Sequence, residues 1–115
     1  MIIKGTARVD RRTKNLVKRL QPNEIAVIDH QDIDEIAAES LVASKIKAVV
    51  NASESISGRY PNPGPLKIIK AGILLVDCAG KEIMEEIEEG QEITINSGNI
   101  YVGDKLIASG RILTL

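Results

Sequence analysis

EIAVIDHQDIDEIAAESLVASKIKAVVN, residues 24–51, contains two short apolar runs separated by an amphipathic segment. The runs at 24–29 and 47–51 are bounded by turn residues, which is typical of strands buried inside a sheet. Between them, Asp32 is predicted to cap a helix, with Glu35 completing a capping box and an apolar side continuing to about residue 45. We therefore expect a strand, a helix and a second strand in succession.

The same order continues downstream. Pro65 suits the first turn of a helix over 66–70, Gly72 supplies a left-handed cap, and ILLVD at 73–77 is a third apolar run. Strands that alternate with helices at this spacing predict an α/β fold with a short parallel sheet and helices covering a face.

The flanking segments extend this unit. Residues 1–10 are expected to form a strand and residues 11–20 a short helix. After Gly80, residues 81–90 predict another short helix, and turns at 97–99 and 103–104 predict an antiparallel meander. We expect a single domain made of a basic strand–helix lead (1–21), an α/β core (22–90) and a C-terminal meander (91–115).

The composition restricts what holds this domain together. The 115 residues include no Trp or Phe and only two tyrosines, so the core must be aliphatic. A single cysteine, Cys78, excludes a disulfide within the chain, and we expect it to be a buried structural thiol in a reducing compartment. There is no signal-peptide pattern and no apolar run of about 20 residues, so a cytoplasmic location is expected.

Charge is distributed unevenly along the chain. Residues 1–20 contain seven basic residues and one acid, Asp10, whereas the remainder is strongly acidic. We define a basic docking patch: Arg8, Arg11, Arg12 and Lys14. It is expected to dock on an acidic surface of the domain itself or of a partner domain, or to reach a nucleotide phosphate there. Nucleic-acid binding is not expected, because the remainder is acidic and offers few aromatic side chains for stacking.

NASESISGRYPNPGP, residues 51–65, joins the second strand to the next helix. A loop between the carboxyl end of a parallel strand and a helix amino terminus can hold a phosphate or carboxylate. The candidate ligand-binding residues are Ser55, Ser57, Gly58, Arg59, Asn62 and Gly64. The loop is not a P-loop, because it lacks the Gly-Lys-Ser/Thr ending. The alternative is a connector stiffened by prolines, in which Arg59 pairs with an acid of the same molecule.

DHQDID, residues 29–34, brings the only histidine together with three acids. Asp29, His30, Asp32 and Asp34 could in principle hold Mn²⁺ or Zn²⁺. A structural role is favoured instead, because Asp32 caps the helix and Asp34 then lies in its first turn. The sequence therefore predicts neither a metal site nor a cofactor.

Five stretches together resemble a known family. They are GTARVDRRTKNLVKRL (5–20), IAVIDH (25–30), DEIAAESLV (34–42), AVVNASESISGRYPNPGP (48–65) and AGILLVD (71–77). They look like the opening domain of the bacterial SteA-like cytokinetic-ring proteins, whose following domain is similar to thiamin pyrophosphokinase. The resemblance implies a longer protein that continues past residue 115 into a pyrophosphokinase-like domain and a membrane-anchored tail.

Residues 24–102 are also similar in order to the swivelling phosphohistidine domain of phosphoenolpyruvate-utilising enzymes, and EGQEITINSGNIYVG (89–103) echoes the close of that domain. This resemblance implies a three-layer β/β/α arrangement. In those enzymes a histidine at the junction of loop and helix carries the phosphoryl group. Here Asn62, Pro63, Gly64 and Pro65 stand at the junction, so we argue against phosphocarrier chemistry on this loop.

Three functions stay open at this stage. The first is a non-catalytic accessory domain that binds a phosphorylated ligand or docks on the downstream nucleotide-binding domain. The second is part of a nucleotide or pyrophosphate-transfer site shared between domains, to which Arg59 and the basic docking patch contribute. The third is a protein-interaction module in cell division, which includes self-association into a homo-oligomer.

Overall fold

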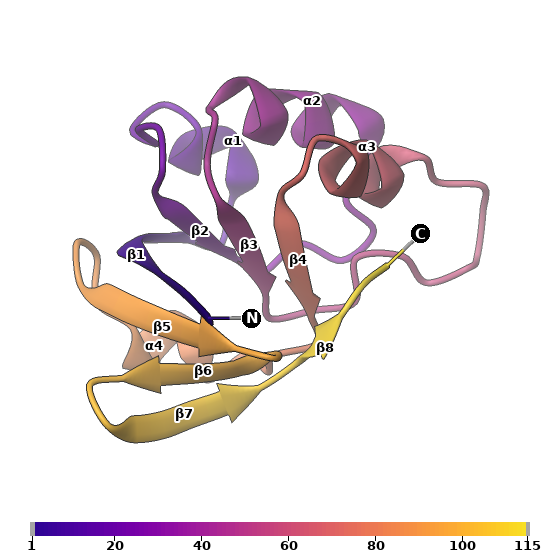
Figure 1. The fold of residues 1–115 in the computed structure, drawn as a ribbon. Coiled ribbons are helices and arrows are strands. Elements are labelled where there is room, and N and C mark those ends of the chain that lie inside the picture. Colours follow the sequence, from indigo (N-terminus) through magenta and orange to yellow (C-terminus); the bar gives the residue numbers. More distant parts are fainter. Residues whose placement is uncertain (1, 115) are drawn as a thin grey trace.

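Strand β1, Ile2–Asp10, takes part in two kinds of pairing in the computed structural model, which describes residues 2–114. Its first half pairs antiparallel with β5, Glu92–Asn96, in the register Ile3↔Ile95. Its second half pairs parallel with β2, Ile25–Ile28, in the register Val9↔Val27. This strand therefore connects the parallel part of the molecule to the antiparallel part (Figure 1).

The remaining strands continue from β1 in both directions. On one side, β3 (Ala48–Asn51) and β4 (Leu74–Asp77) run parallel to β2, and β8 (Arg111–Ile112) closes antiparallel to β4. On the other side, β5, β6 (Asn99–Val102) and β7 (Lys105–Ser109) form an antiparallel meander. The sheet order is β7-β6-β5-β1-β2-β3-β4-β8.

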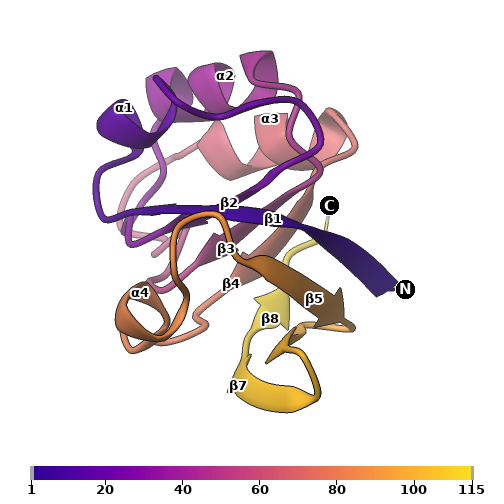
Figure 2. The same cartoon turned by 90° about the vertical axis from the view of Figure 1, so that its left-hand side faces the viewer.

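The helices and the meander lie on opposite faces of the parallel strands. Figure 2 shows α1 (Thr13–Leu16), α2 (Glu35–Ala43) and α3 (Gly64–Lys70) on one side, with β5 and β7 on the other. The short helix α4, Ile83–Glu86, lies beside the meander. The predicted α/β fold with its three-layer β/β/α arrangement is therefore confirmed.

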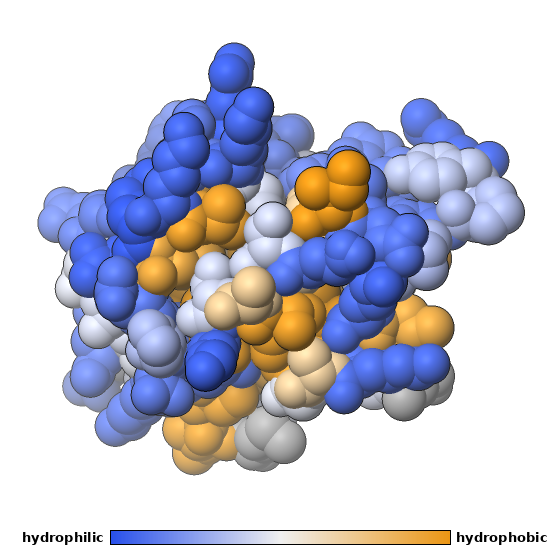
Figure 3. Space-filling model, turned by 90° about the horizontal axis from the view of Figure 1, so that it is seen from above, coloured by the Kyte–Doolittle hydropathy of each residue, from blue (hydrophilic) through white to orange (hydrophobic). Residues whose placement is uncertain are grey.

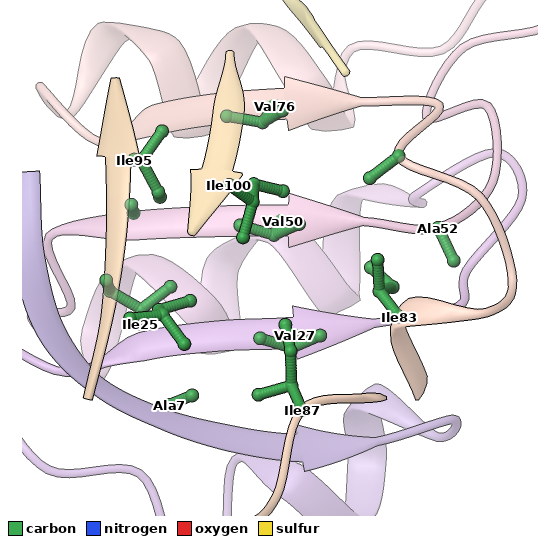
Figure 4. Packing of buried hydrophobic residues seen from close by; sticks show 13 residues of the cluster. Ala7, Ile25, Val27, Val50, Ala52, Val76, Ile83, Ile87, Ile95 and Ile100 are labelled. Carbon is green, nitrogen blue, oxygen red and sulfur yellow. The ribbon is translucent and has the colours of Figure 1, made fainter. Parts of the chain in front are cut away.

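Two aliphatic clusters hold these layers together. Successive strand residues point to opposite faces, so each parallel strand contributes to both clusters. Figure 4 shows Ile25, Val27, Val50 and Val76 from the parallel strands packing with Ile95 and Ile100 of the meander. On the other face, Ile28, Val49 and Leu75 pack under Leu41 and Ile68 of the helices. Burial on both faces explains why the three strands appear in the sequence as continuous apolar runs.

The second helix starts later than predicted. Asp34, not Asp32, is its N-cap, and the Asp34 carboxylate accepts the Ala37 N–H at 2.7 Å. Glu35 is therefore the first helical residue and cannot complete a capping box. Asp32 lies in the preceding loop with φ of 53°.

Further boundaries and one burial prediction also change. The basic helix expected over 11–20 spans only Thr13–Leu16, and the acidic one expected over 81–90 spans only Ile83–Glu86. Cys78 is exposed, so the prediction of a buried thiol was wrong. None of the helices within residues 2–114 has the length and apolar composition that crossing a bilayer requires.

Candidate functional site

Polar side chains gather where the parallel strands end. Asp29 and His30 follow β2, Asn51 ends β3, and Asp77 ends β4, while the segment 11–14, with three basic residues, follows β1. We call this region the carboxyl edge. In open α/β sheets, ligands bind in the crevice outside the carboxyl ends of the strands.

Asn51 holds the carboxyl edge together from inside. Its side chain is fully buried, and its Oδ1 accepts the N–H groups of His30 at 3.0 Å and Ser53 at 3.1 Å. Its Nδ2 donates to the His30 carbonyl and to Ser55 Oγ, each at 2.8 Å. The amide group thus makes all four of its hydrogen bonds and fixes the segments that follow β2 and β3 against each other.

Asp29 is a carboxylate that the chain neutralises itself. It accepts a hydrogen bond from Ser53 Oγ, its Oδ2 lies 3.1 Å from Lys81 Nζ, and Arg11 lies 3.5 Å away. Partial burial raises the pKa of Asp29, but the Ser53 hydrogen bond and the charges of Lys81 and Arg11 outweigh it and lower that pKa below its ordinary value. Asp29 is therefore ionised and paired.

His30 is positioned by a hydrogen bond of 2.8 Å between its Nδ1 and Oγ1 of the buried Thr13. This contact leaves Nε2 for another partner. A pocket of about 350 Å³ opens beside the ring, and its cationic walls are Arg11, Arg12 and Lys14. We call it the cationic pocket.

The structure separates the basic docking patch into two parts. Arg11, Arg12 and Lys14 line the cationic pocket. Arg8 lies elsewhere, 2.9 Å from Glu24 and 3.6 Å from Glu89, so it is engaged in ion pairs within the domain. Within residues 2–114, the side chains of Arg12 and Lys14 form no ion pair.

Two serines in the first half of the loop over 51–65 are hydrogen-bonded within the domain. Ser55 is fully buried, its Oγ accepts from Asn51 and its N–H donates to the buried Asp77 carboxylate at 2.8 Å. Ser57 donates both its N–H and its hydroxyl to Asp32. These two serines are therefore already hydrogen-bonded to other groups of the same chain.

Within residues 58–64 of the loop, some residues are buried and others are exposed to solvent. Gly64 is buried, and a Cβ added there would lie 2.1 Å from the Ile33 carbonyl oxygen, so glycine permits close contact between α3 and the segment before α2. Its N–H donates to Asn62 Oδ1 at 3.1 Å. Gly58 and Arg59 are exposed at the loop tip, and Arg59 makes no ion pair with the described part of the chain.

The four residues considered for a metal have separate partners. Asp29 faces Ser53 and Lys81, His30 faces Thr13, Asp32 faces Ser57, and Asp34 caps α2. Among the residues the structure describes, no three His, Cys, Asp or Glu side chains could share an ion.

Sequence reasoning missed several residues of the carboxyl edge. They are Thr13, Asn51, Ser53 and Lys81. Asn51 could have been found from the sequence, because it is a polar residue at the end of an otherwise apolar predicted strand. Lys81 had none, because its contact with Asp29 spans 52 residues of sequence.

Comparison with known proteins shows the fold. No protein-family model matches this chain, and no curated protein matches it significantly. A crystal structure of 3-isopropylmalate dehydratase (leuD) from Methanocaldococcus jannaschii matches 99% of this chain and 84% of that chain, with a TM-score of 0.64 and 16% identity. A potential metal-dependent hydrolase with cyclase activity matches 96% of this chain and 63% of that chain, with a TM-score of 0.59 and 15% identity.

Proposed function

We propose that this chain is a non-catalytic binding module that holds a phosphorylated ligand in the cationic pocket at its carboxyl edge. The observation that carries the proposal is that Arg12 and Lys14 line this pocket without an ion pair to any carboxylate in residues 2–114. Arg8, from the same basic segment, instead forms an ion pair with Glu24 at 2.9 Å. Cations left together at a ligand-binding edge favour an anion.

The groups around the pocket match the chemistry of a phosphoryl group. The planar guanidinium of Arg12 can donate two parallel hydrogen bonds to phosphate oxygens, and Lys14 adds a mobile point charge. Asp29 is the carboxylate in the pocket wall, and Lys81 and Arg11 offset its charge. The balance of charge therefore favours a ligand that carries at least one negative charge.

The resemblance to SteA-like proteins gives this binding a context. In that setting the module would lie in the cytoplasm beside a pyrophosphokinase-like domain and present the ligand to it. Arg59, exposed at the loop tip, is then the group through which a nucleotide or pyrophosphate site could be shared between the domains.

An NMR titration of the chain with inorganic phosphate, at constant ionic strength, tests the proposal. We expect saturable shifts of the amide signals of residues 11–14 and His30. The double variant Arg12→Gln/Lys14→Gln should abolish them, whereas Lys105→Gln, which removes an exposed cation from β7, should leave them unchanged. Absence of saturable shifts in the unmodified chain, or equal loss in both variants, would refute phosphate binding at this pocket.

A second candidate function, docking of another protein domain, is favoured by an apolar surface near α3. Ile56 and Leu66 are 39% and 40% exposed, and they line one pocket with Ile69 and Leu113. A second pocket continues from Ile69 and Leu113 to Ile112. Exposed aliphatic side chains that gather over neighbouring pockets are typical of a protein contact. Sedimentation of the chain before and after Leu66→Gln would test the self-association form of this function.

A further inference from the structure

A second pocket adjoins the cationic pocket and has a different lining. It encloses about 400 Å³ between α1 and α2, and Val17, Ile36 and Ala37 form its apolar wall. We call it the apolar pocket. Thr13, Lys14 and His30 line both pockets, so the two volumes meet at these side chains.

We propose that the ligand is a phosphate ester with a compact, uncharged apolar or aromatic body. Its phosphoryl group occupies the cationic pocket and its body occupies the apolar pocket. This inference rests on the proposed function and adds the class of molecule that the site accepts. His30 and Lys14 stand at the boundary, where the ester oxygen of such a molecule would lie.

The size and lining of the apolar pocket support a small molecule. Pockets for small ligands enclose roughly 300–1,000 Å³ and combine apolar walls with a few polar groups. Here the polar residues around the apolar wall are Thr13, Lys14, His30, Asp34 and Ser40. Figure 3, which views the helix-covered face from above, shows apolar patches among polar side chains on this side of the molecule.

Ile36, in the wall of the apolar pocket, is largely exposed. Its side chain is 79% exposed, although it lies on the helix that covers the sheet. Covering an isoleucine with an apolar group is favourable, because apolar surface leaves water. A ligand body lying against Ile36 and Val17 gains this contribution, whereas inorganic phosphate cannot.

Asp34 influences which charge is favoured on the body of the ligand. Asp34 lines the apolar pocket, and its carboxylate is held in place because it caps α2 through the Ala37 N–H. A second anionic group in the apolar pocket would lie near this fixed negative charge. The pair of pockets therefore favours one phosphoryl group and a neutral body over a molecule with a charge at each end.

Titration with methyl phosphate and phenyl phosphate tests the inference, because the two esters share the phosphoryl group and differ in the body. We expect phenyl phosphate to bind the unmodified chain roughly tenfold more tightly than methyl phosphate. Ile36→Gln should reduce this ratio to about two, without changing methyl phosphate binding. The matched control Leu106→Gln, which replaces an exposed leucine of β7, should leave both affinities unchanged.

The outcomes separate this inference from the proposed function. If both esters bind equally well, or if Ile36→Gln leaves the ratio unchanged, the apolar pocket does not receive the body, although phosphate binding stands. If Ile36→Gln weakens both esters equally, the inference is likewise overturned. If neither ester nor inorganic phosphate binds, the proposed function itself fails.

Discussion

The carboxylate of Asp32 accepts two hydrogen bonds from Ser57, one from the backbone N–H at 2.7 Å and one from the hydroxyl at 2.9 Å. On the same side, the N–H of Asp32 donates to the Glu54 carbonyl, and the N–H of Ile33 donates to the Ser55 carbonyl. The serine-rich loop therefore does hold an anion, and that anion is a side chain of the same molecule. This contact ties the loop to the segment before α2.

Asp32→Ala is expected to loosen the loop. Two donors of Ser57 lose their acceptor, and the left-handed backbone of residue 32, with φ of 53°, suits alanine less well than aspartate. We expect a loss of about 1–3 kcal/mol in the free energy of unfolding. Hydrogen exchange at the Ser57 amide should accelerate strongly. Unchanged protection of that amide would show that Asp32 does not hold the loop.

Asp34→Ala should instead affect the start of α2. The Ala37 N–H loses its acceptor, and removal of an N-cap side chain costs about 1 kcal/mol. Exchange at the Ala37 amide should accelerate while the Ser57 amide stays protected. In Asp32→Ala the pattern should be the reverse. If Asp32→Ala exposes Ala37 instead, the cap assigned to Asp34 is wrong.

Two glycines of the loop should respond very differently to alanine. At Gly64 the added Cβ would lie 2.1 Å from the Ile33 carbonyl oxygen and 2.8 Å from that of Asp34, both backbone atoms. At Gly58 no atom lies within 4 Å, and the cost comes only from its φ of 81°. We expect Gly58→Ala to cost about 1 kcal/mol and Gly64→Ala more than about 3 kcal/mol, measured by urea unfolding. Equal costs would contradict the close contact at Gly64.

The arrangement of layers could be predicted because the signal is local and repeated. In each of the runs at 24–29, 47–51 and 73–77, apolar residues occur at successive positions, which point to opposite faces of the sheet. This pattern predicts that other elements pack on both faces. The start of α2 could not be predicted as well. The sequence pattern favours Asp32 as the cap, because Glu35 follows it by three residues. In the fold the Asp32 carboxylate instead binds Ser57, which lies 25 residues away in sequence.

The candidate site was predictable only in part, for the same reason. Arg11, Arg12 and Lys14 are close in sequence, and they line one pocket. Arg8 belongs to the same basic run, but it extends to Glu89, which only the folded chain brings near. The burial of Ser55 and Gly64 likewise depends on what packs over them, and composition cannot reveal that.

Glu89 should make the domain sensitive to acid. Hydrogen bonds from Arg19 lower the pKa of Glu89 below its ordinary value of 4.5, against a smaller opposing effect of burial, and the Val9 N–H and the charge of Arg8 lower it further. The unfolded chain therefore binds this proton at a higher pH than the folded chain does. The contribution of Glu89 to stability is fully present above pH 4.5 and is lost as the pH falls through the lowered pKa.

Glu89→Gln should therefore weaken the domain at pH 7 and flatten the decline of its stability below pH 4.5. Urea midpoints measured between pH 7 and the acid limit would show both effects. Glu88→Gln is the matched control, because it removes the neighbouring charge and Glu88 forms no ion pair within residues 2–114. It should leave the decline as steep as in the unmodified chain. Parallel curves for Glu89→Gln and the unmodified chain would mean that the ion pairs joining Glu89 to Arg8 and Arg19 do not stabilise the fold.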